Sequence, residues 1–248
     1  MRRADRLVGL ARSVAIYHLI PRRQRRLRSL YSQWLEAGDL VFDVGAHVGN
    51  RTRAFAALGC RVVAVEPQPH VAALLRTLAG RIPDVTVVEA AVSDRTGRVR
   101  LAVSDRTPTV STTSDAWREA RGHEAGFAGV EWNRTVEVEA TTLDALIAAY
   151  REPAFVKLDV EGAEAAALQG LSVPVKGLSF EYLGGAVASA EACATRLAAL
   201  APYRFNWSAG ESSRLGVETW LDHHALIERL SAVPPAEHGD VYARRLAA

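Results

Sequence analysis

Short, almost continuous apolar runs alternate along the chain with segments in which apolar residues recur at helical spacing. Such runs are typical of strands buried on both faces of a parallel sheet, and the helical segments between them are typical of crossover connections. We therefore predict an α/β fold with a seven-stranded, mostly parallel sheet and helices on both faces. The predicted strands are residues 41–42, 61–66, 85–92, 154–160, 177–183, 203–207 and 216–221. The predicted helices are residues 50–58, 70–78, 143–150, 164–171, 186–200 and 223–230.

Two further segments, residues 97–104 and 134–140, alternate apolar and polar side chains instead. This alternation is typical of half-exposed strands, so we predict an inserted antiparallel strand pair. The loop between them, residues 105–133, is long enough to suggest a function. We interpret it as part of a lid over the molecule on which the protein acts, its acceptor. Its candidate contact residues are Ser111, Thr112, Thr113, Trp117, His123 and Trp132.

The two ends of the chain lie outside this pattern. For residues 1–36 we predict an extension of two helices separated at Pro21. Five arginines lie between residues 22 and 28. That basic segment is either a helical cover with a solvated face or a weak contact surface for a membrane or an anionic partner. We assign residues 37–233 to one α/β domain and residues 234–248 to a loosely held C-terminal tail.

Composition narrows the class of protein. At 248 residues and 49% apolar content, the chain can form one large core, and a net charge of +2 does not predict a nucleic-acid partner. The two cysteines, Cys60 and Cys193, form no metal pattern and predict no disulfide framework, which fits a reducing, cytoplasmic location. The sequence lacks an uninterrupted apolar run long enough for a transmembrane helix. Composition does not determine the oligomeric state, and a homodimer is possible.

The segment from Val41 to Pro67 predicts a strand, a glycine turn, a helix and a second strand, which together form a nucleotide-binding βαβ unit. Asp43 precedes the turn, where a dinucleotide pyrophosphate would disfavour an acid. Glu66 ends the second strand, where a carboxylate can accept hydrogen bonds from both ribose hydroxyls. The two acids therefore suit a nucleoside that carries positive charge, as S-adenosylmethionine (SAM) does.

The same segment resembles motif I of Rossmann-like SAM-dependent methyltransferases, which is an acid followed by three alternate glycines. Here the pattern consists of Asp43, Gly45, His47 and Gly49. His47 replaces the middle glycine, which leaves open how closely the backbone approaches the cofactor at that point.

A second charged segment, KLDVEG at residues 157–162, ends an otherwise apolar strand. Burying three charges there costs free energy unless they form ion pairs or contact a ligand. By strand alternation Lys157 and Asp159 share a face, and Glu161 can sit at the start of the following helix. The carboxyl ends of parallel strands are where α/β sheets bind ligands.

The two motifs, in this order and spacing, resemble the FkbM family of methyltransferases over residues 38–222. The resemblance implies a Rossmann-like class I methyltransferase fold and SAM-dependent methylation of a hydroxyl on a sugar, polyketide or similar small molecule. It implies SAM binding by Asp43, Gly45, His47, Gly49, Asn50, Glu66 and Pro67, with Glu89 and Ala91 near the adenine. Lys157, Asp159 and Glu161 would border the transferred methyl group.

Asp159 is the predicted base for the acceptor proton, with Lys157 tuning its charge and Glu161 orienting the turn. The alternative role for these residues is a buried ion pair that holds the strand end. We predict no metal site; a metal-assisted alternative would use Asp159, Glu181 and His47.

Three other functions remain open. A nicotinamide-dependent oxidoreductase would require a GxGxxG turn. The sequence does not supply one, because His47 occupies the position of the second glycine. A non-catalytic SAM-binding protein would tolerate neutral replacement of Asp159. A nucleic-acid methyltransferase that acts on a base amine would carry an Asn-Pro-Pro-aromatic segment, which is missing from the sequence.

Overall fold

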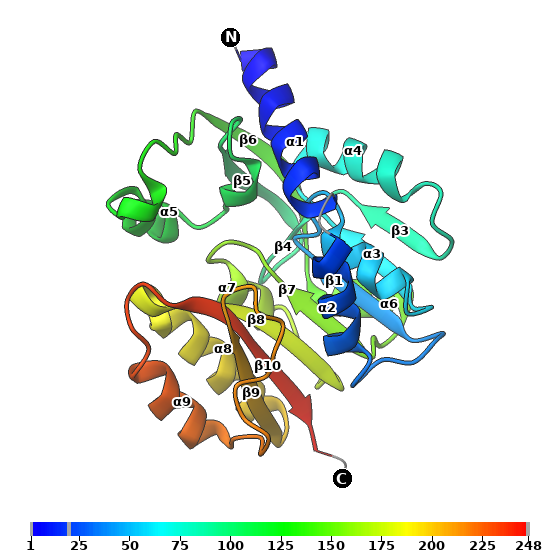
Figure 1. Ribbon diagram of the computed structural model, residues 1–248, viewed down its shortest axis with the longest axis vertical. Helices are drawn as coiled ribbons and strands as arrows, with labels where there is room; N and C mark the ends of the chain where they lie inside the picture. The colour runs from blue at the N-terminus through cyan, green and yellow to red at the C-terminus, as the bar shows by residue number, and fades with distance from the viewer. Residues whose placement is uncertain (1, 19–20, 247–248) are drawn as a thin grey trace.

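The computed structural model describes residues 2–18 and 21–246, and a seven-stranded sheet lies at its centre (Figure 1). Its strand order is β3-β2-β1-β7-β8-β10-β9. The first five strands of that order are parallel, and β10 is antiparallel to both of its neighbours. The bounds are β1 Leu40–Val44, β2 Arg61–Val65, β3 Val85–Val88, β7 Phe155–Leu158, β8 Gly177–Leu183, β9 Tyr203–Ala209 and β10 His238–Arg245. The predicted α/β fold with a mostly parallel seven-stranded sheet is confirmed.

Helices cover both faces of this sheet because successive residues of each buried strand point to opposite sides. Phe42 and Val44 pack in the core cluster formed with α6, α7, α8 and α9, whereas Val41 packs with α2 and α3. On that second face α4 packs over Ala64 through Leu75. These helices are α2 Pro21–Tyr31, α3 Asn50–Ala56, α4 Pro69–Ala79, α6 Leu143–Tyr150, α7 Glu164–Gln169, α8 Val187–Leu200 and α9 His223–Ser231.

The C-terminal segment contributes an internal strand of the sheet. Strand β10 pairs with β8 from His238 to Arg244 and with β9 from Gly239 to Arg245. The prediction of a loosely held tail from residue 234 is therefore wrong. Only Val241, Tyr242 and Ala243 form an apolar run there, which is too short to distinguish a strand by pattern.

Two predicted strands also differ from the structure. Residues 216–221 make only an isolated bridge, Leu221 to Phe205, so the seventh strand is β10 instead. The run 85–92 divides into β3 and β4 Ala91–Val92, and β4 leaves the main sheet. It pairs with β6 Arg134–Thr141, which is antiparallel to β5 Gly97–Val103. The predicted antiparallel pair is thus confirmed, and it belongs to a three-stranded sheet.

The segment between β5 and β6 contains short helices as well as loop. These are η1 Pro108–Val110, α5 Asp115–Gly122 and η2 Ala125–Phe127, and η3 Gly184–Ala186 follows β8 elsewhere in the chain. The hydroxyl oxygen of Ser114 accepts a hydrogen bond from the backbone N–H of Trp117, which caps α5. We retain lid as the name for residues 105–133.

The two predicted N-terminal helices are confirmed within the described residues. Helix α1 spans Arg2–His18 and contacts η1, and α2 buries Leu27, Leu30 and Tyr31 against α3. The break between the predicted helices falls at residues 19–20, outside the described residues. Figure 1 shows α1 above the carboxyl edge of the sheet and α2 in front of the sheet, beside β1 and α3.

Candidate active site

An open cavity, whose empty space together with the solvent at its mouth is about 860 Å³, lies at the carboxyl ends of β1, β2 and β7. The strand order places β1 between β2 and β7, and the crossovers leave β1 in opposite directions, so this is the crevice where α/β sheets bind ligands. The α1 helix and the lid complete its walls through Tyr17, Ser111 and Thr113. Of the predicted site residues, the cavity lining includes Asp43, Gly45, His47, Asn50, Glu66, Pro67, Ala91, Asp159 and Glu161.

The turn after β1 brings two strand ends close together. Gly45 has φ +78°, and the backbone N–H groups of Gly45 and Ala46 both donate to the carbonyl oxygen of Val65. A Cβ atom on Gly45 would overlap the carbonyl oxygen of Asp159. Glycine is therefore needed here for both its left-handed conformation and its missing side chain.

His47 replaces a motif glycine without losing the glycine-like backbone conformation. Its φ is +49°, in the left-handed region, and its N–H donates to Glu66 Oε2 at 3.0 Å. The imidazole packs edge-on against the Tyr17 ring, with 5.8 Å between ring centroids. Burial lowers the pKa of His47 to about 4, so the ring is neutral near pH 7. The side chain thus lies between the turn and α1.

The two acids of the βαβ unit are both buried at the cavity. Asp43 is 2% exposed and accepts a hydrogen bond of 2.5 Å from the Thr52 hydroxyl. Glu66 is also 2% exposed, and its two oxygens accept from the N–H groups of His47 and Gln68. Burial raises the pKa of both carboxyls, that of Glu66 to about 7.

Asn50 begins α3 at the same edge of the cavity. Its side-chain oxygen and its carbonyl oxygen both accept from the Gln24 amide, while its own Nδ2 is buried without a hydrogen-bond partner. An unpartnered buried donor is costly, so this amide is a candidate ligand contact.

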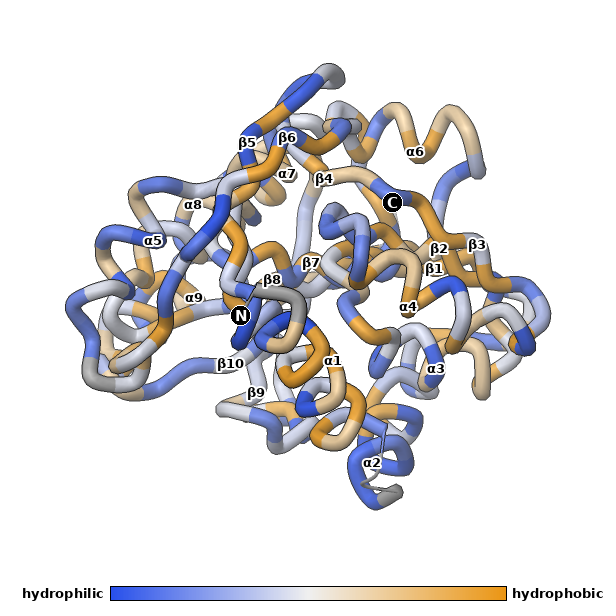
Figure 2. Tube along the Cα trace, turned by 90° about the horizontal axis from the view of Figure 1, so that it is seen from above, coloured by the Kyte–Doolittle hydropathy of each residue, from blue (hydrophilic) through white to orange (hydrophobic). Residues whose placement is uncertain are grey.

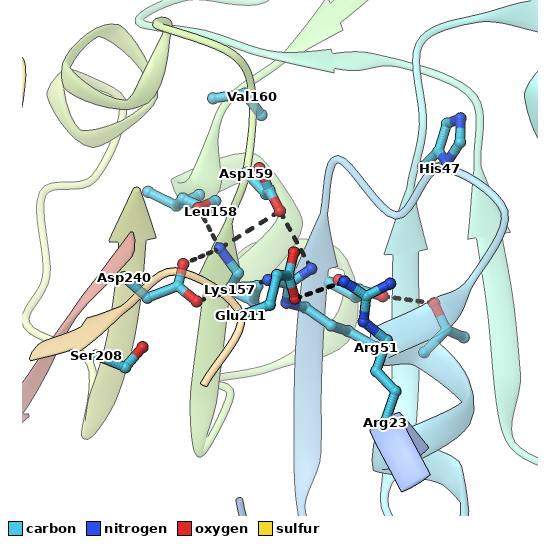
Figure 3. A network of polar contacts seen from close by, with 12 residues as sticks. Arg23, His47, Arg51, Lys157, Leu158, Asp159, Val160, Ser208, Glu211 and Asp240 are labelled. Atoms are coloured by element: carbon cyan, nitrogen blue, oxygen red, sulfur yellow. Dashed lines mark hydrogen bonds and ion pairs between the residues drawn. The ribbon is translucent and has the colours of Figure 1, made fainter. Parts of the chain in front are cut away.

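The predicted catalytic strand end contains a larger ionic network than the sequence indicates (Figure 3). Lys157 is fully buried, and its Nζ lies 2.8 Å from Asp240 Oδ1 and 3.6 Å from Asp159 Oδ2. Arg51 of α3 pairs with Asp159 at 3.3 Å and with Asp240 at 3.5 Å. Asp159 therefore faces the cavity between two cations, and Lys157 supports it from below.

Arg51 and Asp240 are functional candidates that the sequence analysis missed. Arg51 directly follows the GN of motif I, so its place in the first turn of α3 was an available signal. Asp240 gave no such signal, because it lies in the segment that we predicted as a tail. Burial opposes ionisation of Asp240, but Lys157 and Arg51 outweigh it and hold the pKa of Asp240 below its ordinary value.

Three glutamates surround the turn that follows β7. Glu161 has φ +53° and lines the cavity, and its carbonyl oxygen accepts a hydrogen bond from the Thr112 hydroxyl of the lid. Glu164, rather than Glu161, opens α7, and its Oε1 accepts from the N–H of Val160 at 3.0 Å. Glu164 therefore orients the turn, which corrects the role predicted for Glu161. Burial, followed by the nearby Glu181 carboxylate, raises the pKa of Glu161 well above its ordinary value.

The lid closes over the cavity through its first half. Ser111 and Thr113 line the cavity, and the Ser111 hydroxyl donates to Gln68 Oε1 at 3.0 Å. Trp117 and Trp132 instead form an aromatic cluster with Phe127. His123 is exposed. Of the candidate lid contacts, the structure therefore brings Ser111 and Thr113 to the cavity.

Three predicted site residues do not line the cavity. The Glu89 carboxylate pairs with Arg76 at 2.8 Å, and the neighbouring Ala90 and Ala91 face the cavity in its place. Gly49 packs against Leu75, and Lys157 is fully buried beneath Asp159, 3.6 Å from its carboxylate. Across residues 2–18 and 21–246, no three His, Cys, Asp or Glu side chains are arranged to hold a metal ion, so the alternative ligand set Asp159, Glu181 and His47 does not converge.

The strand order and the acid-bearing βαβ unit define an α/β nucleotide-binding site of the methyltransferase type. Residues 43–182 match the family model of the methyltransferase FkbM domain, and this chain belongs to that family. The chain is also 26% identical over 149 residues to the 2-O-methyltransferase NoeI of Sinorhizobium fredii strain NBRC 101917 / NGR234. That match covers 58% of this chain and 61% of NoeI, less than two thirds of the relative.

Solved structures with a similar course of the chain include two methyltransferases. Precorrin-6y C5,15-methyltransferase from Geobacter metallireducens GS-15 is 12% identical, with a TM-score of 0.43 and coverage of 89% of this chain and 88% of that one. A SAM-dependent O-methyltransferase from Thermotoga maritima is also 12% identical, with a TM-score of 0.42 and coverage of 92% and 66%. Both likenesses are remote.

Proposed function

We propose that this protein transfers a methyl group from SAM to a hydroxyl oxygen of a small molecule. The observation that carries the proposal is the pair of buried carboxylates, Asp43 and Glu66, at adjoining strand ends on one cavity. A dinucleotide pyrophosphate would be repelled at Asp43, whereas the cationic amino-acid portion of SAM would be attracted there. Glu66 is placed to accept hydrogen bonds from ribose hydroxyls.

Two further features fit that donor. The missing side chain at Gly45 lets the turn after β1 lie directly against the carbonyl oxygen of Asp159, so that the turn and Asp159 line one cavity. The unpartnered Nδ2 of Asn50 offers a hydrogen-bond donor at the cavity edge. Bound SAM would supply an electrophilic methyl group on a sulfonium centre, and every other requirement of the reaction falls to the protein.

The protein must align the acceptor oxygen with that methyl group and remove the hydroxyl proton. Alignment alone can lower the barrier by up to roughly 7–11 kcal/mol. Asp159 is the proposed proton acceptor, because its carboxylate lines the cavity while Arg51 and Lys157 hold its position. Lys157 and Arg51 are positioning residues in this proposal. Glu161, on the same wall, is the competing candidate.

A hydroxyl acceptor is supported by the relative NoeI, whose name describes a 2-O-methyltransferase. The acceptor side of the cavity is also polar, with Tyr17, Thr109 and Thr113 from α1 and the lid. These hydroxyls suit a sugar or another polyhydroxylated small molecule better than an apolar substrate.

Binding and transfer are tested separately. In a thermal-shift assay, SAM or its demethylated product should raise the melting temperature and NAD should not. Transfer of labelled methyl from SAM to a panel of sugars, polyketides and carrier-bound intermediates should then yield an alkali-stable methyl ether. Stabilisation by NAD, or methyl transfer to nitrogen or carbon acceptors only, would reject the proposal.

The proton acceptor is tested with Asp159→Asn and the matched variant Glu161→Gln. Asp159→Asn should lower turnover by about 10²–10⁴-fold and leave SAM affinity nearly unchanged. Glu161→Gln should retain most of the activity. The reverse pattern would assign the proton to Glu161 instead.

A further inference from the structure

We propose that the surface formed by α1 and α2 docks the protein on an anionic lipid bilayer. This helical surface consists of the outward side of α1 and the exposed arginines of α2. The proposal does not depend on the methyl-transfer reaction. It rests on the unusual orientation of α1 and on the distribution of charge beside it.

Helix α1 turns its apolar side outward. Leu7, Val8 and Ile16 are 65%, 57% and 39% exposed. They share that side with three exposed alanines, Ala4, Ala11 and Ala15, and with Arg12. In a helix that covers a protein in water, the apolar side normally faces the core.

Several polar side chains of α1 point inward and contact the rest of the protein, beside the partly buried Leu10 and Val14. Arg6 pairs with Asp105 at 3.3 Å, and Asp5 pairs with Arg106 at 3.6 Å, both at the start of the lid. His18 contacts the carbonyl oxygen of Val48 through its Nε2 at 2.7 Å. These contacts fix the rotation of α1, so the exposed apolar residues are not an accident of a loosely placed helix.

Helix α2 adds a cluster of positive charge on the same side of the molecule. Arg22, Arg25, Arg26 and Arg28 are exposed, and none of them pairs with an acid in the described part of the chain. Figure 2 shows α1 and α2 on one side of the molecule, with hydrophobic turns on α1 and a mostly hydrophilic α2. The Arg23 guanidinium stacks on the Tyr17 ring at 5.1 Å and so joins the two helices.

An anionic bilayer satisfies both parts of this surface. Apolar side chains can enter the boundary between headgroups and acyl chains, while flanking arginines meet lipid phosphates. A second copy of the chain fits less well, because a two-fold contact would bring the arginine clusters of both copies to one interface. A nucleic acid would match the arginines and leave Leu7 and Val8 without a partner.

The helical surface borders the candidate active site. Tyr17 follows the exposed Ile16 directly and lines the cavity. A protein docked through α1 would therefore hold the cavity wall beside the lipid headgroups.

The test is co-sedimentation of the full chain with vesicles of phosphatidylcholine, with and without phosphatidylglycerol. The wild type should bind the anionic vesicles, and added salt should weaken the binding. Leu7→Gln/Val8→Gln should reduce partitioning about tenfold or more. Arg25→Gln/Arg26→Gln should reduce it roughly 25-fold, at about fivefold per charge.

The matched control, Arg81→Gln/Arg100→Gln, removes two exposed arginines elsewhere and should change partitioning little. Unchanged melting temperatures would establish that each variant is folded. Equal binding to neutral vesicles, or equal losses in the control, would overturn the proposal. It would also be overturned if the wild type were a dimer that Leu7→Gln/Val8→Gln converts to a monomer without affecting vesicle binding.

Discussion

The close approach of β1 to β7 at Gly45 leads to a quantitative prediction. Alanine at this position would have to adopt φ near +78° and would also place its Cβ against the carbonyl oxygen of Asp159. The first effect costs about 1–2 kcal/mol for a residue other than glycine. Overpacking against a backbone atom adds about 1–3 kcal/mol.

Gly38 separates these two contributions. It has φ +92°, and a Cβ atom there would have no neighbour within 4 Å. Gly38→Ala should therefore cost only the conformational part, about 1–2 kcal/mol, whereas Gly45→Ala should cost about 2–5 kcal/mol. For a domain of this size, those values correspond to melting-temperature losses of about 2–8 °C and about 4–20 °C.

The two variants should also differ in cofactor affinity. Relief of the overlap at position 45 must move the β1 turn away from Asp159, which displaces Asp43 and His47 at the cavity. Differential scanning calorimetry and calorimetric titration with SAM should show a lower melting temperature and weaker binding for Gly45→Ala. Gly38→Ala should bind SAM normally. Equal melting temperatures for the two variants, or unchanged SAM affinity in Gly45→Ala, would refute the reasoning.

Three other predictions concern the buried charges and the last strand. The pKa of Glu66 is raised from 4.5 to about 7, so the native state binds this proton more tightly than the unfolded state does. The bound proton therefore stabilises the protein at low pH, and this stabilisation is lost as the pH rises from 4.5 to about 7. Glu66→Gln should flatten this part of a curve of unfolding free energy against pH, measured by urea unfolding. SAM affinity should rise over the same interval, since the carboxylate is the better acceptor, and this trend should be missing in Glu66→Gln. Asp240→Asn should lower the free energy of unfolding by about 3–5 kcal/mol, because it leaves the buried Lys157 with a weaker partner. The control Asp94→Asn, at an exposed position, should change it little. Equal urea midpoints for the two variants would contradict the buried pairing. Truncation after Val233 removes β10 from between β8 and β9 and should abolish cooperative thermal unfolding, whereas a truncated chain that melts like the wild type would restore the tail interpretation.

The local sequence determined the βαβ unit and the positions of its acids. Each of these features depends on residues close together in the chain: apolar runs, glycines at turns and charges at strand ends. Asp43 and Glu66 consequently lie at one cavity, as predicted from the alternation of strands and helices. The antiparallel pair of β5 and β6 was predictable for the same reason, because its alternation is a local property.

The tertiary structure alone decided how the remaining charges are used. Lys157 and Asp240 are 83 positions apart, and only the insertion of β10 beside β8 brings them into contact. A strand that gains hydrogen bonds from neighbours on both sides needs little apolar sequence of its own, so the sequence of β10 resembled that of a tail. The outward apolar side of α1 is likewise invisible in the sequence, because helical spacing shows that a side exists and only packing decides which way it faces.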